Sequence, residues 1–166
     1  IDRMHIYGEK LAVITSALMF GLFHGNLSQL FYAFALGLVF GYVYLKTGRL
    51  RYSIGLHMLI NFIGSVVGPF FLEKLAVLDT METMDLATLE PILPWLLGFG
   101  AYVLVLIGLA IAGLVLLCIN KRRVSFAPAE LELPKESRFR TVYLNVGMIL
   151  LILGCAALII SNVMML

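Results

Sequence analysis

Two histidines in this sequence stand in strongly apolar stretches, and each has a partner four residues away. Phe20 precedes His24 in LMFGLFHGN, and His57 precedes Asn61 in SIGLHMLINF. Residues four apart share one face of a helix, so each pair can point at one spot. An ionisable or amide side chain is costly in hydrocarbon and usually faces a bundle interior or a watery cavity, where it marks a functional site. The spacing therefore indicates chemistry inside a membrane.

The residue types suit catalysis at a carbonyl group. The His57 imidazole and the Asn61 carboxamide offer hydrogen bonds without a fixed charge, which suits a developing oxyanion in a water-poor site. His24 can handle a proton or ligate a metal, because its ordinary pKa lies near neutrality. Phe20 can wall the site and fix the imidazole rotamer. For each pair taken singly, a structural role as a hydrogen bond between helices stays open.

The composition predicts the elements that must position these residues. Of the 166 residues, 61% are hydrophobic and 13% charged, and the apolar residues form long runs. Runs of about 18 apolar residues are typical of membrane-spanning helices. We therefore expect an all-α, polytopic transmembrane helical bundle with five spans, at 11–27, 30–45, 53–72, 94–119 and 142–166. Cys118 and Cys155 lie within apolar runs and predict no disulfide framework.

Basic residues are unevenly distributed among the connections between these spans. Eleven of the twelve Lys and Arg precede span one, follow span two or lie in residues 120–141, whereas Lys74 alone lies in the opposite, acidic loop. Lys and Arg in short loops stay cytoplasmic. The start is then cytoplasmic and the C-terminus outside, in a multi-pass protein of the cell membrane. This bias explains the basic clusters, so we expect no nucleic-acid partner. His5 lies in the polar start and is expected to be solvated or interfacial.

Small residues recur at four-residue spacing in two of the spans. Ala33, Gly37 and Gly41 do so in the second, and Gly64 and Gly68 in the third. Such stripes let helix backbones approach closely in lipid. We expect them to pack the first three spans together around the histidines.

The two motifs in this order resemble the CPBP family of intramembrane proteases, which includes the CAAX-processing endopeptidases and bacterial proteins linked to bacteriocin processing and self-immunity. The resemblance rests on F-x-x-x-H at Phe20–His24, LFYAFALGLVFGYVYLKTGRL, and H-x-x-x-N at His57–Asn61, and covers roughly residues 11–64. The third family motif, E-E-x-x-x-R, is absent from these 166 residues, and Glu9 has no second acid beside it. We expect that motif upstream, and we expect these residues alone to be inactive.

The resemblance implies hydrolysis of a peptide bond in a membrane-associated or lipidated peptide or protein. It implies that a glutamate of the missing motif and His24 activate water, and that His57 and Asn61 hold the oxyanion. No cofactor is expected; the alternative is zinc, with His24 and His57 among its ligands. Asn is a poorer zinc ligand than Cys, His or carboxylate, which favours the metal-free version.

The expected organisation has three parts. Residues 1–72 form a catalytic core portion of three spans, 73–93 an extracytoplasmic loop, and 94–166 two further spans with a cytoplasmic linker at 120–141. The expected partners are membrane lipid and a peptide or protein substrate, with no expectation for the oligomeric state. Two other functions stay open: a non-catalytic scaffold or bacteriocin-immunity-type binding protein with the same fold, and a transporter fragment.

Overall fold

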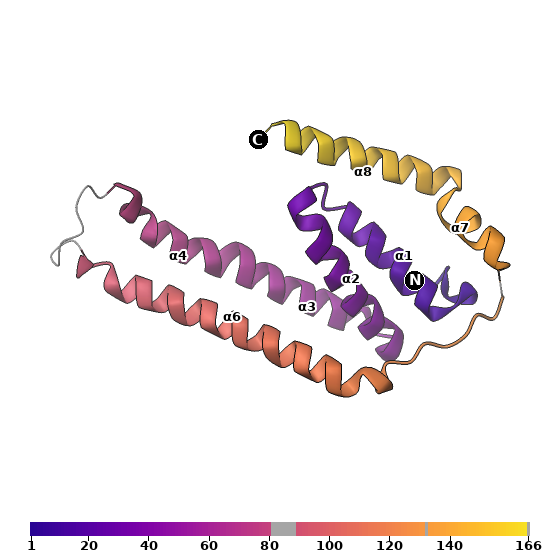
Figure 1. The fold of residues 1–166 in the computed structure, drawn as a ribbon, viewed down its shortest axis with the longest axis horizontal. Coiled ribbons are helices and arrows are strands. Elements are labelled where there is room, and N and C mark those ends of the chain that lie inside the picture. Colours follow the sequence, from indigo (N-terminus) through magenta and orange to yellow (C-terminus); the bar gives the residue numbers. More distant parts are fainter. Residues whose placement is uncertain (81–88, 132, 166) are drawn as a thin grey trace. The chain divides into compact units, whose positions relative to one another are not determined.

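The computed structural model describes residues 1–80, 89–131 and 133–165, and every regular element in them is helical (Figure 1). This confirms the all-α prediction. The α-helices are α1 (Glu9–Leu22), α2 (Leu27–Thr47), α3 (Leu50–Phe62), α4 (Gly68–Leu75), α6 (Leu93–Asn120), α7 (Lys135–Tyr143) and α8 (Val146–Met164). The shorter elements are 3-10 helices at His5–Tyr7 (η1), Ala76–Thr80 (η3) and Lys121–Arg123 (η4), and a π-helical segment at Ile63–Val67 (η2).

Four helices of the described residues are long and apolar enough to cross a membrane. They are Leu27–Thr47, Leu50–Asp79, Leu93–Arg123 and Val146–Met164. The polytopic prediction is confirmed, but its count of five spans is wrong for this part of the chain. The expected first span is α1, whose 14 residues extend only about 21 Å, less than the hydrocarbon core of roughly 30 Å.

The connections also differ in detail from the expected loops. The helix that begins at Leu50 continues to Asp79, so the first part of the predicted 73–93 loop is helical. Residues 81–88 of that loop lie outside the described residues. The last expected span is found as α8, but it begins at Val146 rather than 142. The reason is that α7 ends at Tyr143, and the Asn145 side chain caps a new helix by accepting from the Met148 backbone N–H at 3.0 Å.

The contacts divide the chain into two compact units, residues 1–55 with 126–166, and residues 56–125. In the first unit, α1 and α2 form an antiparallel hairpin (Figure 1). Ala17 and Ala33 are fully buried there, and a Cβ added at Gly37 would lie 2.9 Å from the Ala17 Cα. The small-residue stripe of α2 therefore packs against α1 at backbone distance, as the sequence predicts.

The segment between η4 and α7 lies against the beginning of α1. The Leu131 backbone N–H donates to the Ile6 carbonyl at 2.9 Å, and the Ala127 N–H donates to the Glu9 carboxylate at 2.8 Å. The Phe126 ring packs edge-on to Tyr42 on α2, with centroids 5.5 Å apart. These contacts order much of the predicted linker.

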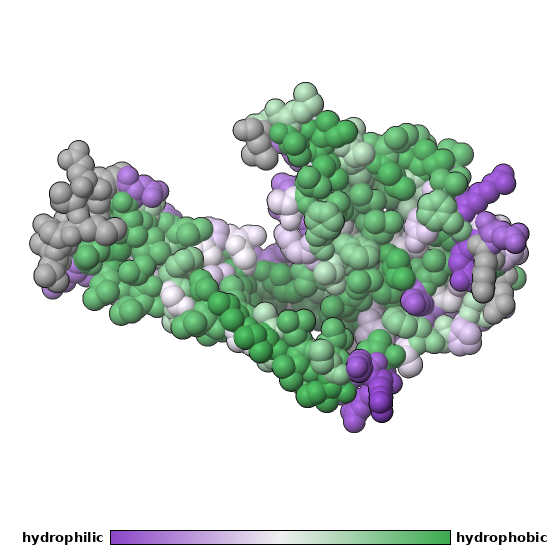
Figure 2. All heavy atoms as spheres, viewed as in Figure 1, coloured by the Kyte–Doolittle hydropathy of each residue, from purple (hydrophilic) through white to green (hydrophobic). Residues whose placement is uncertain are grey.

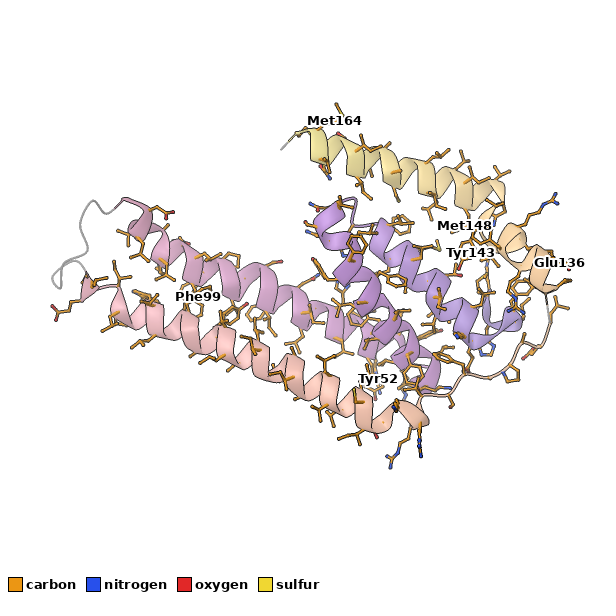
Figure 3. The ribbon with its side chains drawn as sticks, viewed as in Figure 1. Tyr52, Phe99, Glu136, Tyr143, Met148 and Met164 are labelled. Atoms are coloured by element: carbon orange, nitrogen blue, oxygen red, sulfur yellow. The ribbon has the colours of Figure 1, made fainter. Side chains whose placement is uncertain are left out.

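The second unit is built on the packing of α4 against α6. The Tyr102 ring stacks on Phe71 with centroids 5.8 Å apart, and Figure 3 shows Phe99 on the side of α6 that faces α4. Gly98 permits this approach, because an added Cβ would lie 2.9 Å from a Phe71 ring carbon. The Tyr102 hydroxyl also donates to the Ile63 carbonyl at 3.0 Å, where the π-helical segment begins.

The surfaces of α6 and α8 are strongly apolar. None of the α6 residues is buried, and its exposed side chains are mostly Leu, Ile and Val. Figure 2 shows apolar residues along α6, with hydrophilic residues gathered at the end where Lys121–Arg123 lie. A helix that is apolar all round and has a charged end is typical of a membrane span.

Candidate functional site

The first motif lies where α1 ends. The apolar run predicts a helix that continues to residue 27, but α1 ends at Leu22, so Phe20 is helical and His24 lies in the following turn. The extension is wrong because Gly25 has a φ of 60°, a left-handed conformation that few residues other than glycine adopt. Asn26 then caps α2 through its side chain.

A hydrogen bond to the last turn of α1 holds the His24 ring in place. The Nδ1 atom lies 2.7 Å from the Phe20 carbonyl oxygen. A carbonyl can only accept, so Nδ1 carries the proton and Nε2 of the neutral ring carries the lone pair. Such a bond sets both the tautomer and the ring orientation, the arrangement that a general base or a metal ligand needs.

The Phe20 ring lies against the His24 imidazole. The two rings meet edge to face, with centroids 4.9 Å apart. On its other side the Phe20 ring meets Phe40 of α2, with centroids 5.7 Å apart. Edge-to-face pairs of this kind contribute about 0.5–1.5 kcal/mol beyond the area they bury. Phe20 therefore links the His24 ring to the packed interior of the α1–α2 hairpin.

The second motif lies on α3, where His57 and Asn61 are one helical turn apart, as expected. His57 is half-buried and makes contacts of its own, whereas Asn61 is exposed in the structure. The Phe20–His24 pair belongs to the first compact unit and the His57–Asn61 pair to the second. The convergence of the two motifs on one pocket stays a prediction.

Glu9 is unsuited to be the water-activating carboxylate. It begins α1, about 20 Å of helix away from the end that carries His24. Its carboxylate accepts from Lys46 Nζ at 3.0 Å and from the Ala127 N–H at 2.8 Å. These two bonds hold the pKa of Glu9 below its ordinary value, the Ala127 amide having the larger effect. A carboxylate with a lowered pKa is a weak base.

The described residues do not bring together a full set of zinc ligands. Among residues 1–80, 89–131 and 133–165, no three His, Cys, Asp or Glu side chains lie close enough to hold a metal ion. His24 and His57 would need at least a third protein ligand to make a catalytic zinc site.

A separate pocket of about 390 Å³ lies at the other end of α1. It is lined by Tyr7, Gly8, Lys10, Leu11, Ile14, Ala127, Pro128, Ala129 and Arg138. None of the motif residues lines it, so it has no part in the candidate site.

Two polar residues near the first motif were not singled out from the sequence. The Ser53 hydroxyl donates to the Phe40 carbonyl at 2.8 Å, and the Asn162 amide donates to the Gly25 carbonyl at 2.6 Å. Ser53 stands four residues before His57, a spacing that could have suggested it. For Asn162 the one signal is a carboxamide near the end of an apolar run.

Comparison with known proteins agrees with the resemblance carried by the motifs. Residues 2–63 match the family described as Rce1-like, the type II CAAX prenyl endopeptidase Rce1-like proteins. Both candidate pairs, Phe20–His24 and His57–Asn61, lie within the matched residues. No curated protein and no solved structure matches the chain.

Proposed function

We propose that this membrane protein, whose residues 2–63 carry the pattern of CAAX prenyl endopeptidases, is an intramembrane endopeptidase of a membrane-associated or lipidated peptide. The observation that carries the proposal is the His24 ring. It lies within the matched segment, and its bond to the Phe20 carbonyl places a proton on Nδ1, so Nε2 is the nitrogen that can accept a proton in the neutral ring. This is the tautomer that a base assisting water activation through Nε2 requires.

In the proposed reaction His24 works with a glutamate of the family's E-E-x-x-x-R motif, which is absent from the 166 residues. The water oxygen forms a bond to the scissile carbonyl carbon, and the water proton passes to the glutamate–His24 pair. The carbonyl electron pair moves onto oxygen, where donors from His57 and Asn61 stabilise the oxyanion. The C–N bond then breaks, and the leaving nitrogen takes up the proton.

The resemblance implies that both motifs form one site, and the start of α3 lies in the same compact unit as the first motif. Ser53 donates to the Phe40 carbonyl, and the Phe40 ring packs on Phe20, the partner of His24. His57 follows Ser53 by one turn on the same helix. A water-poor site increases the value of each hydrogen bond to the oxyanion.

The test is a cleavage assay on the full-length protein in liposomes. The substrates are a prenylated C-terminal peptide and the same peptide without the lipid. We expect His24→Ala to lower kcat by at least about 100-fold, and His57→Ala and Asn61→Ala each by about 100- to 1,000-fold. His5→Ala is the matched control, because His5 lies beside Glu9 at the other end of α1 and should leave cleavage unchanged.

Unchanged cleavage in all three variants would contradict the proposal. Binding of the peptide by the wild-type protein without any cleavage would favour the non-catalytic binding protein instead.

A further inference from the structure

We propose that Asn162 of α8 is a positioning residue for His24, an inference that rests on the proposed function. The Asn162 Nδ2 donates to the Gly25 carbonyl at 2.6 Å, and Gly25 directly follows His24. Asn162 is 137 residues further along the chain, so α8 reaches back over the turn that presents the imidazole.

The Gly25 carbonyl needs a partner from outside its own helices. It belongs to the turn between α1 and α2, where a backbone oxygen has no place in a helical hydrogen-bond ladder. Gly25 is buried in the structure. A buried carbonyl without a donor would cost about 1–3 kcal/mol. The carboxamide of Asn162 supplies that donor.

The bond also accounts for a carboxamide on α8. This helix is otherwise almost wholly apolar, and most of its residues are exposed. An unpaired amide in or near hydrocarbon would be costly, and its bond to Gly25 offsets that cost. The same helix packs on the turn through Leu158, whose Cβ would lie 3.6 Å from a Cβ built on Gly25.

A second polar contact fixes α8 near its beginning. The Tyr143 hydroxyl, just before α8, hydrogen-bonds to the Thr15 hydroxyl of α1 at 3.0 Å, and Figure 3 shows Tyr143 directed toward α1. Thr15 is buried. With Asn162 on Gly25, α8 is therefore tied to α1 and to the turn beyond it at two separated points.

The consequence is that His24 is held from both sides. Its ring is bonded to Phe20 of α1, and the next peptide is bonded to Asn162 of α8. Preorganisation of this kind matters because a displacement of about 1 Å in a catalytic group can cost up to about 100-fold in rate. Asn162 therefore affects catalysis only by fixing the position of His24.

The first arm of the test measures the placement of α8 without any activity. In a full-length protein carrying Cys118→Ser and Cys155→Ala, we add Gly25→Cys and Leu158→Cys. A Cβ separation near 3.6 Å suits a disulfide, so oxidation should crosslink the pair within one chain. Gly25→Cys with Ile160→Cys is the control, because residues two apart point to different sides of a helix. Cysteine is strained at the left-handed φ of Gly25, so the two pairs are compared in proteins of equal thermal stability. At equal stability, absence of the crosslink in the first pair, or equal crosslinking in the second, would overturn the inference.

The second arm measures kinetics on the full-length enzyme. We expect Asn162→Leu to lower kcat about tenfold with KM nearly unchanged, and Asn162→Gln, which keeps the donor, to recover part of that loss. Asn120→Leu is the matched control, since Asn120 donates in the same way to the Leu116 carbonyl on α6. A merely structural role would lower the folded fraction and leave kcat per folded enzyme unchanged.

The two arms separate this inference from the proposed function. Equal kcat for Asn162→Leu and wild type, with His24→Ala inactive, would overturn the positioning role alone. A fully active His24→Ala enzyme would overturn both.

Discussion

Glu9 shows how a single carboxylate holds the beginning of the α1–α2 hairpin. Its side chain is only 11% exposed, and it accepts from the Lys46 ammonium and the Ala127 amide at the same oxygen, Oε2. These are charge-assisted hydrogen bonds, which are stronger than neutral ones. Glu9 thereby connects α1, α2 and the segment before α7.

The lowered pKa of Glu9 predicts how stability depends on pH. The Ala127 amide, followed by Lys46, favours the charged form in the folded state. The stabilisation is therefore fully present above the ordinary pKa of about 4.5 and is lost as the pH falls through the folded value. We expect Glu9→Gln to lower the Tm at pH 7 and to flatten its decline below about pH 4.5. Thermal unfolding in detergent across pH measures this.

Glu130→Gln is the control for this prediction, because Glu130 is exposed in the same segment. Glu9→Gln and Glu130→Gln curves that coincide with wild type at every pH would contradict the structural role of Glu9.

At the scale of elements, the α1–α2 hairpin depends on the absence of one side chain. A Cβ at Gly37 would lie 2.9 Å from the Ala17 Cα, which is backbone and cannot turn aside. We expect Gly37→Ala to destabilise the protein by about 1–3 kcal/mol, as overpacking does. Gly108→Ala on α6 is the matched control, because no described atom lies within 4 Å of its added Cβ. That change should be neutral or stabilising by about 0.5–1 kcal/mol.

Denaturant unfolding, followed by the far-UV signal, measures both variants. Equal stability of Gly37→Ala and Gly108→Ala would mean that the helices do not approach at backbone distance.

The elements that could be predicted are those with a strong one-dimensional signal. Apolar runs indicate α2, α3, α6 and α8, because hydrocarbon sets a minimum length for a span. The close α1–α2 packing follows from small residues at four-residue spacing. Helix ends were less predictable. Hydropathy continues past Leu22, whereas the end of α1 depends on the left-handed conformation of Gly25.

Some residues of the candidate site could likewise be predicted from the sequence, and others could not. Phe20, His24, His57 and Asn61 could be found because their spacing is local and chemistry in an apolar run is conspicuous. The contact between Asn162 and Gly25 could not be found, because hydropathy and periodicity carry no information about a partner 137 residues away.

The four candidate spans are separated by connections that differ in charge. The Lys46–Glu9 bond places the end of α2 at the same level as the start of α1. Lys46, Arg49 and Arg51 follow α2, and Lys121–Arg123 follow α6, whereas acidic residues dominate the connection between α4 and α6. Basic flanks stay cytoplasmic, so we expect α8 to lead outward. From the end of α2 onward, the expected alternation depends on the three longer helices that follow and not on the length of α1.

This orientation predicts which single cysteines can be labelled from outside. In the full-length protein with Cys118→Ser and Cys155→Ala, a membrane-impermeant maleimide should label Met165→Cys and Glu90→Cys in intact cells. It should label Ser125→Cys only after permeabilisation, because that residue follows the Lys121–Arg123 cluster. Labelling of Ser125→Cys in intact cells, with Met165→Cys protected, would invert the topology and place the C-terminal end of α8, including Asn162, on the cytoplasmic side.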